Sequence, residues 1–121
     1  MENLKVVEIK TFVPAQDYEV SKAFYRDLGF TMTSDEEGIA FFHCGNHSFL
    51  LQDFYESAHA NNFMMHLLVE DVESWYQHIL KAGMADKYSV KLTEPNDRPW
   101  KMRDFILFDP SGVLWRIGQN I

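Results

Sequence analysis

The chain has 121 residues, of which 46% are hydrophobic, 15% aromatic and 24% charged, which is the composition of one folded domain rather than of a disordered segment. Its formal net charge is −7 and no run of Lys or Arg occurs, which argues against binding to nucleic acids or anionic membranes. The single cysteine, Cys44, excludes an intrachain disulfide and any zinc site built from several cysteines. No apolar run approaches the roughly 20 residues of a membrane-spanning helix or the length of a signal peptide, so we expect a cytoplasmic protein.

The first half of the sequence is predicted to contain one strand, one helix and three further strands. The stretch LKVVEIKTFV, residues 4–13, alternates in polarity and is rich in β-branched residues, which is typical of a strand. Asp17 is a suitable N-cap for the helix that follows, and Gly29 is a suitable residue to end it. FTMTS, IAFFHC and SFLLQDF have the pattern of three short strands joined by hairpins.

The second half begins the same pattern again after ESAHANN, which we expect to be a polar connector. We predict a strand over FMMHLLV, followed by a helix that Asp71 caps and Gly83 ends. Three further strands are predicted over YSVKLT, KMRDFILF and VLWRIG, with a long loop over EPNDRPW. A single module of this kind leaves one face and one edge of its sheet uncovered, so the repeat favours two modules side by side, about 1–58 and 59–121. The matched pairs are Asp17 and Asp71, Glu19 and Glu73, and Gly29 and Gly83.

Two stretches, FVPAQDYEVSKAFYRDLGF and the late DPSGVLWRI, resemble the glyoxalase / bleomycin-resistance / extradiol-dioxygenase superfamily, also called vicinal oxygen chelate (VOC) proteins. The resemblance covers nearly the whole chain, and RPWKMRDFILFDPSGVLWRIGQN is similar to the bleomycin-resistance-like branch. It implies a single VOC domain over residues 1–121, of the α+β class, with two βαβββ modules forming a curved mixed eight-stranded sheet around a cleft. It also implies a homodimer.

Enzymes of this superfamily hold a divalent metal with His and carboxylate ligands, and the family pattern places three of these positions at Lys10, Met64 and Arg116. The fourth falls near the end of SFLLQ, where Gln52 is the one suitable donor. A protonated Lys and an Arg offer no lone pair to a cation, and a thioether suits hard oxygen-type sites poorly. We therefore predict that the inherited metal site is lost and that the protein needs no cofactor.

Strand alternation predicts which side chains face the cleft and which pack under the helices. The cleft floor should hold a group of polar residues. The apolar residues that alternate with them along the same strands should be buried. The predicted cleft residues are Glu8, Lys10, Phe12, Gln52, Met64, His66, Leu68, Leu114 and Arg116; the predicted buried ones are Val7, Ile9, Val13, Met65, Leu67, Val69, Val113, Trp115 and Ile117.

Within this floor, Lys10 and Arg116 could receive the anionic part of a ligand, with Gln52 and His66 as orienting hydrogen-bond partners. The alternative is that Glu8 pairs with one or both cations and that His66 is structural. His66 is also the one candidate for a catalytic base, because its ordinary pKa lies near 6.5. We further expect three residues of the segment EPNDRPWKMRD to overhang the cleft mouth and contact the ligand: Trp100, Met102 and Arg103.

These observations leave four hypotheses for the function. The first is a metal-independent homodimer that binds or sequesters an aromatic and acidic small molecule, as bleomycin-resistance proteins sequester a drug. The second is a metal-dependent VOC enzyme, such as a glyoxalase-type lactoylglutathione lyase or a dioxygenase. The third is metal-independent acid–base catalysis by His66, and the fourth is a regulatory module whose cleft is vestigial.

Overall fold

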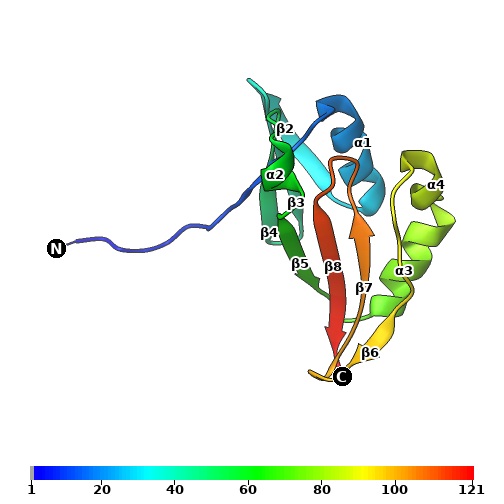
Figure 1. Cartoon of the computed structure of the whole chain (residues 1–121). Helices are drawn as coiled ribbons and strands as arrows, with labels where there is room; N and C mark the ends of the chain where they lie inside the picture. The colour runs from blue at the N-terminus through cyan, green and yellow to red at the C-terminus, as the bar shows by residue number, and fades with distance from the viewer. Residues whose placement is uncertain (1) are drawn as a thin grey trace.

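The computed structural model describes residues 2–121, which form eight strands and four helices in two similar halves (Figure 1). Each half contains one strand, a main helix and three further strands in the predicted order, so the α+β fold of two βαβββ units is confirmed; the short helices α2, in the expected connector ESAHANN, and α4 were not predicted. The strands pair in two four-stranded mixed sheets, with the orders β1-β4-β3-β2 and β5-β8-β7-β6, rather than in one continuous sheet. The strands are β1 (Phe12–Pro14), β2 (Thr31–Glu36), β3 (Ile39–Cys44), β4 (His47–Gln52), β5 (Met64–Leu68), β6 (Asn96–Arg98), β7 (Met102–Phe108) and β8 (Leu114–Asn120); the helices are α1 (Tyr18–Leu28), α2 (Ser57–Ala60), α3 (Val72–Lys81) and α4 (Met84–Tyr88).

The two main helices begin as the sequence predicts. The Asp17 carboxylate accepts a hydrogen bond from the backbone N–H of Val20 at 3.2 Å, and the Asp71 carboxylate accepts one from Ser74 N at 3.1 Å. Each side chain satisfies an N–H group that has no partner within its helix. Helix α1 ends at Gly29, whose φ of 123° is rarely adopted by a residue with a side chain.

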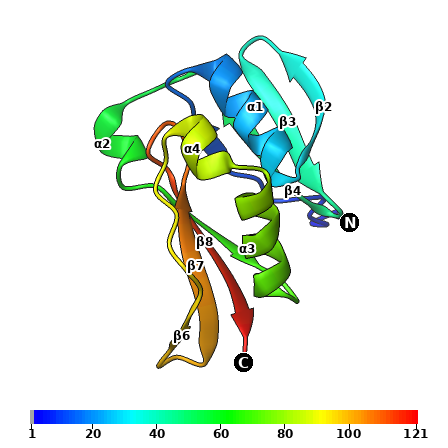
Figure 2. The same cartoon turned by 90° about the vertical axis from the view of Figure 1, so that its right-hand side faces the viewer.

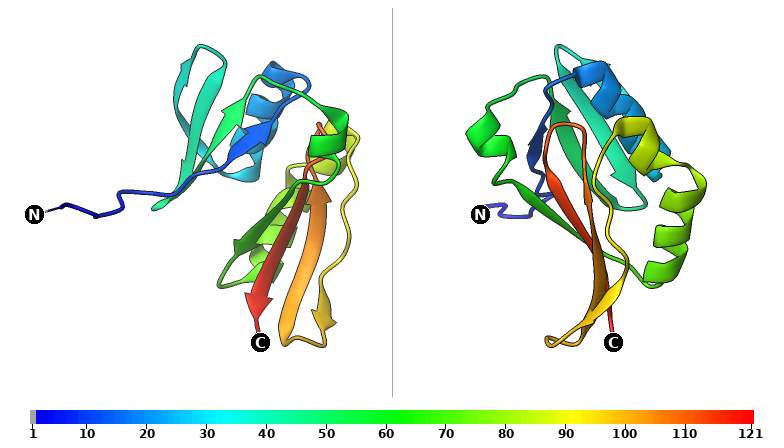
Figure 3. Two further views of the ribbon diagram at one scale, coloured as in Figure 1. Left: turned by 60° about the vertical axis from the view of Figure 1, so that its left-hand side comes forward. Right: turned by 45° about the vertical axis from the view of Figure 1, so that its right-hand side comes forward.

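Helices α1, α3 and α4 all lie on one side of the two sheets, which Figure 2 presents to the viewer. The sheet faces beneath them supply the core, and the predicted buried residues of β5 and β8 do face the helices. Trp115 and Ile117 are buried, while Met65 and Leu67 are partly buried against the same core. The opposite side of each sheet, which we call the open face, is not covered by α1, α3 or α4 (Figure 3).

The two halves are joined through a buried chain of hydrogen bonds. The Tyr25 hydroxyl of α1 donates to the Asp109 carboxylate in the turn before β8, and it accepts from Trp115 Nε1 at 2.9 Å. The other Asp109 oxygen accepts from Ser111 N at 2.8 Å and Val113 N at 2.9 Å. Burial raises the pKa of Asp109 to about 6, and the hydrogen bonds from Tyr25 and the backbone oppose that rise.

A second junction joins α1 to α4 near the surface. The Asp27 carboxylate accepts hydrogen bonds from Lys87 Nζ at 2.7 Å and from the Tyr88 hydroxyl. The hydrogen bonds from Lys87 and Tyr88 lower the pKa of Asp27. The helical layer is therefore continuous from the first half to the second, although the two sheets do not pair with each other.

Two predictions for the fold are wrong. The strand predicted over residues 4–13 is reduced to β1, and the residues before it form an extended arm that projects from the body (Figure 1). Val7 and Ile9, predicted to be core, are 99% and 90% exposed. The segment YSVKLT is not a strand either, since α4 extends to Tyr88. The strand that pairs with β7 is β6, which lies in the segment predicted to be a loop.

None of the helices in residues 2–121 combines the length and the apolar character that crossing a membrane requires.

We predict that Tyr25→Phe lowers the free energy of unfolding by about 1–3 kcal/mol, because it leaves a buried carboxylate and the Trp115 indole N–H without their partner. Chemical denaturation measures this change. Tyr55→Phe is the matched control: the Tyr55 hydroxyl makes no hydrogen bond to the described residues, so its loss should change stability by less than about 0.5 kcal/mol. Equal effects of the two substitutions would contradict a joining role for Tyr25.

Candidate functional site

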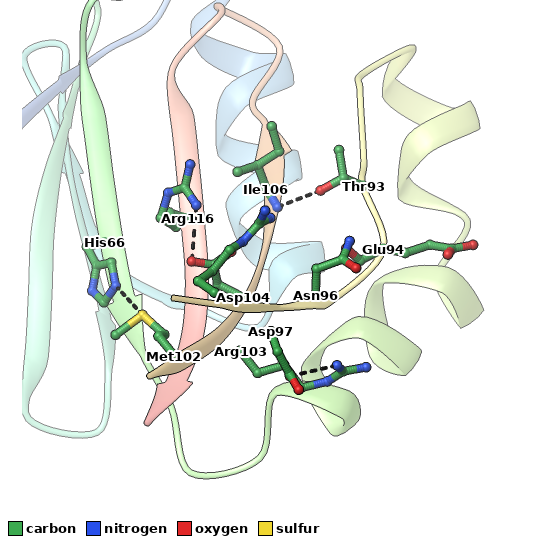
Figure 4. Close-up of polar contacts among 11 residues, drawn as sticks. His66, Thr93, Glu94, Asn96, Asp97, Met102, Arg103, Asp104, Ile106 and Arg116 are labelled. Carbon is green, nitrogen blue, oxygen red and sulfur yellow. Dashed lines mark hydrogen bonds and ion pairs between the residues drawn. The ribbon is translucent and has the colours of Figure 1, made fainter. Parts of the chain in front are cut away.

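The open face of the second sheet gathers most of the polar residues that the sequence analysis placed in the cleft. Parallel pairing of β5 with β8 sets His66 beside Arg116, and antiparallel pairing of β7 with β8 sets Ile106 on the other side of Arg116. Side chains at these positions point away from the helices, because Trp115 and Ile117 on either side of Arg116 point into the core. Figure 4 shows His66, Met102, Asp104 and Arg116 on this face.

Asp104 is the centre of this cluster and is completely buried. One carboxylate oxygen accepts from Arg98 Nε at 2.8 Å, and the other accepts from Arg116 Nη1 at 3.0 Å. The side chains of Arg98 and Arg116 are 30% and 28% exposed. One buried carboxylate is therefore shared by two partly exposed cations, which leaves one positive charge in excess.

These contacts use one nitrogen atom of each guanidinium group. A guanidinium carries five N–H donors in a planar fork that matches a carboxylate or phosphate. The remaining nitrogen atoms of Arg98 and Arg116 can therefore donate to an external anion while Asp104 holds both side chains in place.

His66 and Met102 form the edge of the cluster, with His66 Nε2 3.4 Å from Met102 Sδ. Met102 can lie across β8 because residue 118 is a glycine: a Cβ there would lie 2.8 Å from Met102 Sδ. Met64 and Leu68, on the same face of β5, are 60% and 54% exposed. The cluster thus combines two guanidinium groups with an adjacent apolar surface.

The other predicted cleft residues lie on the first sheet. Phe12 lies on β1, which is an edge strand of this sheet. Gln52 lies at the end of the neighbouring strand β4, where it pairs with Pro14. Lys10 Nζ lies 3.3 Å from Glu8 and 5.3 Å from the centre of the Phe41 ring, so Glu8 pairs with Lys10 and not with Arg116. Glu8 also lines a cavity of about 250 Å³ with residues of β3, β4 and their turn. The predicted floor is therefore divided between the two sheets within one chain.

The segment expected to overhang the cleft is a hairpin between β6 and β7. Trp100 lies at its tip and is 60% exposed. Arg103 points to the helix side, where its Nε and Nη2 donate to Glu73 of α3 at 3.0 and 2.9 Å and its Nη1 donates to Asp97 at 3.0 Å. Arg103 therefore does not lie with the cluster, because it follows Met102 directly on a strand and points to the opposite face.

Sequence reasoning missed Arg98 and Asp104, the two residues that complete the cluster. Arg98 falls in the segment predicted to be a loop, and Asp104 falls in the predicted strand KMRDFILF, whose two faces were not assigned. A hairpin over DRPWKMRD places Asp104 on the same face as Met102, because the two residues are two positions apart on one strand.

The positions that hold the metal in related enzymes do not fit a divalent ion in this chain. Arg116 is protonated and paired with Asp104, Met64 offers only a thioether, and Lys10 lies on the arm beside Glu8. Within residues 2–121, no three His, Cys, Asp or Glu side chains come together in a way that could hold a metal.

Comparison with known proteins places this geometry in a family. A model of the Glyoxalase/Bleomycin resistance protein/Dioxygenase superfamily matches residues 7–117, and the chain belongs to that superfamily. None of the curated proteins matches the sequence.

Three solved structures illustrate the likeness of fold. A bleomycin-binding protein complexed with bleomycin is 22% identical, with a TM-score of 0.81 over 96% of this chain and 100% of that chain. TnmS3, an antibiotic-binding protein from Streptomyces sp. CB03234, is 21% identical, with a TM-score of 0.78 over 98% and 100%. A lactoylglutathione lyase from Agrobacterium tumefaciens is 19% identical, with a TM-score of 0.68 over 95% of each chain. At these identities the likeness shows the fold.

We predict that Asp104→Asn lowers the free energy of unfolding by about 3 kcal/mol, since it leaves two guanidinium groups facing each other without the charge that holds them. Denaturant unfolding measures the loss. Asp97→Asn is the control, because Asp97 contacts Arg103 at the surface and its ion pair should contribute less than about 1 kcal/mol. A loss at Asp104 no larger than that at Asp97 would contradict the central position of Asp104.

Proposed function

We propose that the protein binds an aromatic, acidic small molecule on the open face of the second sheet without a metal ion. The observation that carries this proposal is the pair of guanidinium groups on Asp104, which leaves one positive charge and several free donors on an exposed surface. Charge-assisted hydrogen bonds from Arg98 and Arg116 receive the acidic group of the ligand.

The apolar part of the ligand has a surface beside these donors. Met64 and Leu68 are large exposed apolar side chains on the same face, and exposed apolar area next to oriented polar groups is typical of a ligand site. Met102 and His66 lie between the exposed apolar side chains and the guanidinium groups of this surface. A flat ring can therefore rest on the methionines while its carboxylate meets the guanidinium groups.

This function is sequestration rather than chemistry. His66 contacts Met102, and among residues 2–121 no carboxylate orients its ring, so it lacks the partner that a general base of this kind usually has. The antibiotic-binding proteins of similar fold support a binding role, while the lyase of similar fold is the reason to test metal dependence directly.

We predict that chelator-treated protein binds 2-naphthoate more tightly than its neutral isostere 2-naphthamide. Arg116→Gln should weaken naphthoate binding about tenfold and leave naphthamide binding unchanged, because it removes one charge-assisted hydrogen bond of about 1.5 kcal/mol. Isothermal titration calorimetry measures both affinities.

Arg103→Gln is the matched control, since it removes an arginine from the other face of the same hairpin and should leave both affinities unchanged. Equal binding of the acid and the amide, or binding that returns only when a divalent metal is added, would refute the proposal.

We further propose that the working form is a homodimer in which the arm, residues 2–10, lies on a second copy. Leu4, Val6, Val7 and Ile9 are each more than four-fifths exposed, which is costly for a segment that has no partner. The arm is extended and continues directly into β1, while β1 and β5 each have one unpaired edge. Such edges accept an added strand from another chain.

The dimer also supplies what one chain lacks around the ligand. Within one chain, Phe12 and Gln52 belong to the first sheet, whereas the arginine cluster belongs to the second. A second copy that receives the arm covers part of these open faces and turns an exposed surface into a cleft.

We predict that the protein sediments as a dimer and that the double substitution Val7→Asp and Ile9→Asp shifts it to the monomer, because both acids would have to be buried on the partner. Analytical ultracentrifugation over a concentration series measures the mass. Leu80→Asp, at an exposed apolar residue of α3, should leave the dimer intact. A wild-type monomer, or a dimer indifferent to the arm variant, would contradict the proposed use of the arm.

A further inference from the structure

The helix side of the molecule carries a cavity that the proposed ligand site does not use. It has a volume of about 300 Å³ and lies where the end of α1, the end of β3 and the first turns of α3 meet. It is on the opposite side of the sheets from the arginine cluster, because Cys44 on β3 has the same parity as the core residues Phe42 and Ala40. Its lining residues are Leu28, Gly29, Cys44, Ser74, Trp75 and His78.

Three of its walls are apolar and rigid. Leu28 is fully buried, and Trp75 and Cys44 pack against the core. The remaining wall at the end of α1 is Gly29, whose positive φ favours a residue without a side chain, so nothing projects from it into the space. The indole ring of Trp75 is therefore part of the apolar lining of the cavity.

The polar atoms of the cavity are hydrogen-bond acceptors. His78 Nε2 lies 2.9 Å from the carbonyl oxygen of Asp27, which can only accept, so Nε2 carries the proton and Nδ1 of the neutral ring has a free lone pair. The Ser74 hydroxyl donates to the Asp71 carboxylate at 2.8 Å, which leaves its oxygen lone pairs free. None of the six lining residues is an Asp, Glu, Lys or Arg.

We propose that this cavity is a second binding site, specific for a small uncharged aromatic compound with one hydrogen-bond donor, such as a phenol. The volume is at the lower end for ligand sites and suits one or two rings. The ring packs on Trp75 and Cys44, and the donor meets the acceptors of His78 or Ser74. This ligand differs from the acid proposed for the arginine cluster, and the two sites lie on opposite sides of the sheets.

The first test is an NMR titration of the full chain with phenol and with anisole, its methyl ether without the donor. We expect saturable shifts of the amide signals of Cys44, Ser74 and His78 and of the Trp75 indole with phenol, and roughly tenfold weaker binding of anisole. Trp75→Leu should weaken phenol binding about tenfold, whereas Trp100→Leu, at the exposed hairpin tip, should leave it unchanged.

The second test needs no substitution. Cys44 is the one cysteine of the chain, and its thiolate displaces iodide from iodoacetamide to form a thioether. Phenol should slow this alkylation in proportion to occupancy, and anisole should do so only at higher concentration. The proposal is overturned if phenol leaves the alkylation rate unchanged, if anisole binds equally well, or if the shifts centre on His66 and Arg116 instead.

Discussion

The arrangement of this molecule depends on the hydroxyl group of one buried tyrosine. The two sheets do not pair with each other, so the halves are held together by the helical layer and by the turn before β8. Tyr25 is fully buried at that junction, donates to Asp109 and accepts from Trp115. Because Asp109 also holds the backbone N–H groups of its own turn, the start of β8 and the position of Arg116 further along it follow from this one contact.

The two open faces differ in chemistry while the two core faces do not, because different constraints act on them. The core residues of each sheet pack against the helices, where only apolar side chains fit at native density. The open faces carry no such constraint, since water or a ligand covers them. The first sheet uses this freedom for Phe12 and Phe41, and the second uses it for the guanidinium groups on Asp104.

Local signals were sufficient for α1 and α3 and for the strands that alternate cleanly, since Asp17, Asp71 and Gly29 act within a few residues of their own position. Local signals failed where pairing between segments distant in sequence decides the structure. Residues 4–10 alternate like a strand, but within one chain they have no neighbouring strand to bind, so Val7 and Ile9 stay exposed. Assigning Arg98 and Asp104 to the site required the β6–β7 hairpin to be recognised, because their contact with Arg116 depends on the register of β6, β7 and β8.

The position of Asp104 also decides the sign of the charge that this face attracts. In a metal site, carboxylates outnumber nearby cations, and the ion supplies the missing positive charge. Here one carboxylate already accepts from two guanidinium groups at 2.8 and 3.0 Å. An arriving divalent cation would meet two fixed positive charges within a few ångströms of its one anionic donor, and each repulsion at about 4 Å costs roughly 4 kcal/mol or more per pair of unit charges at an effective dielectric constant of 20. An anion meets the opposite balance, because two positively charged guanidinium groups with unused N–H donors attract it.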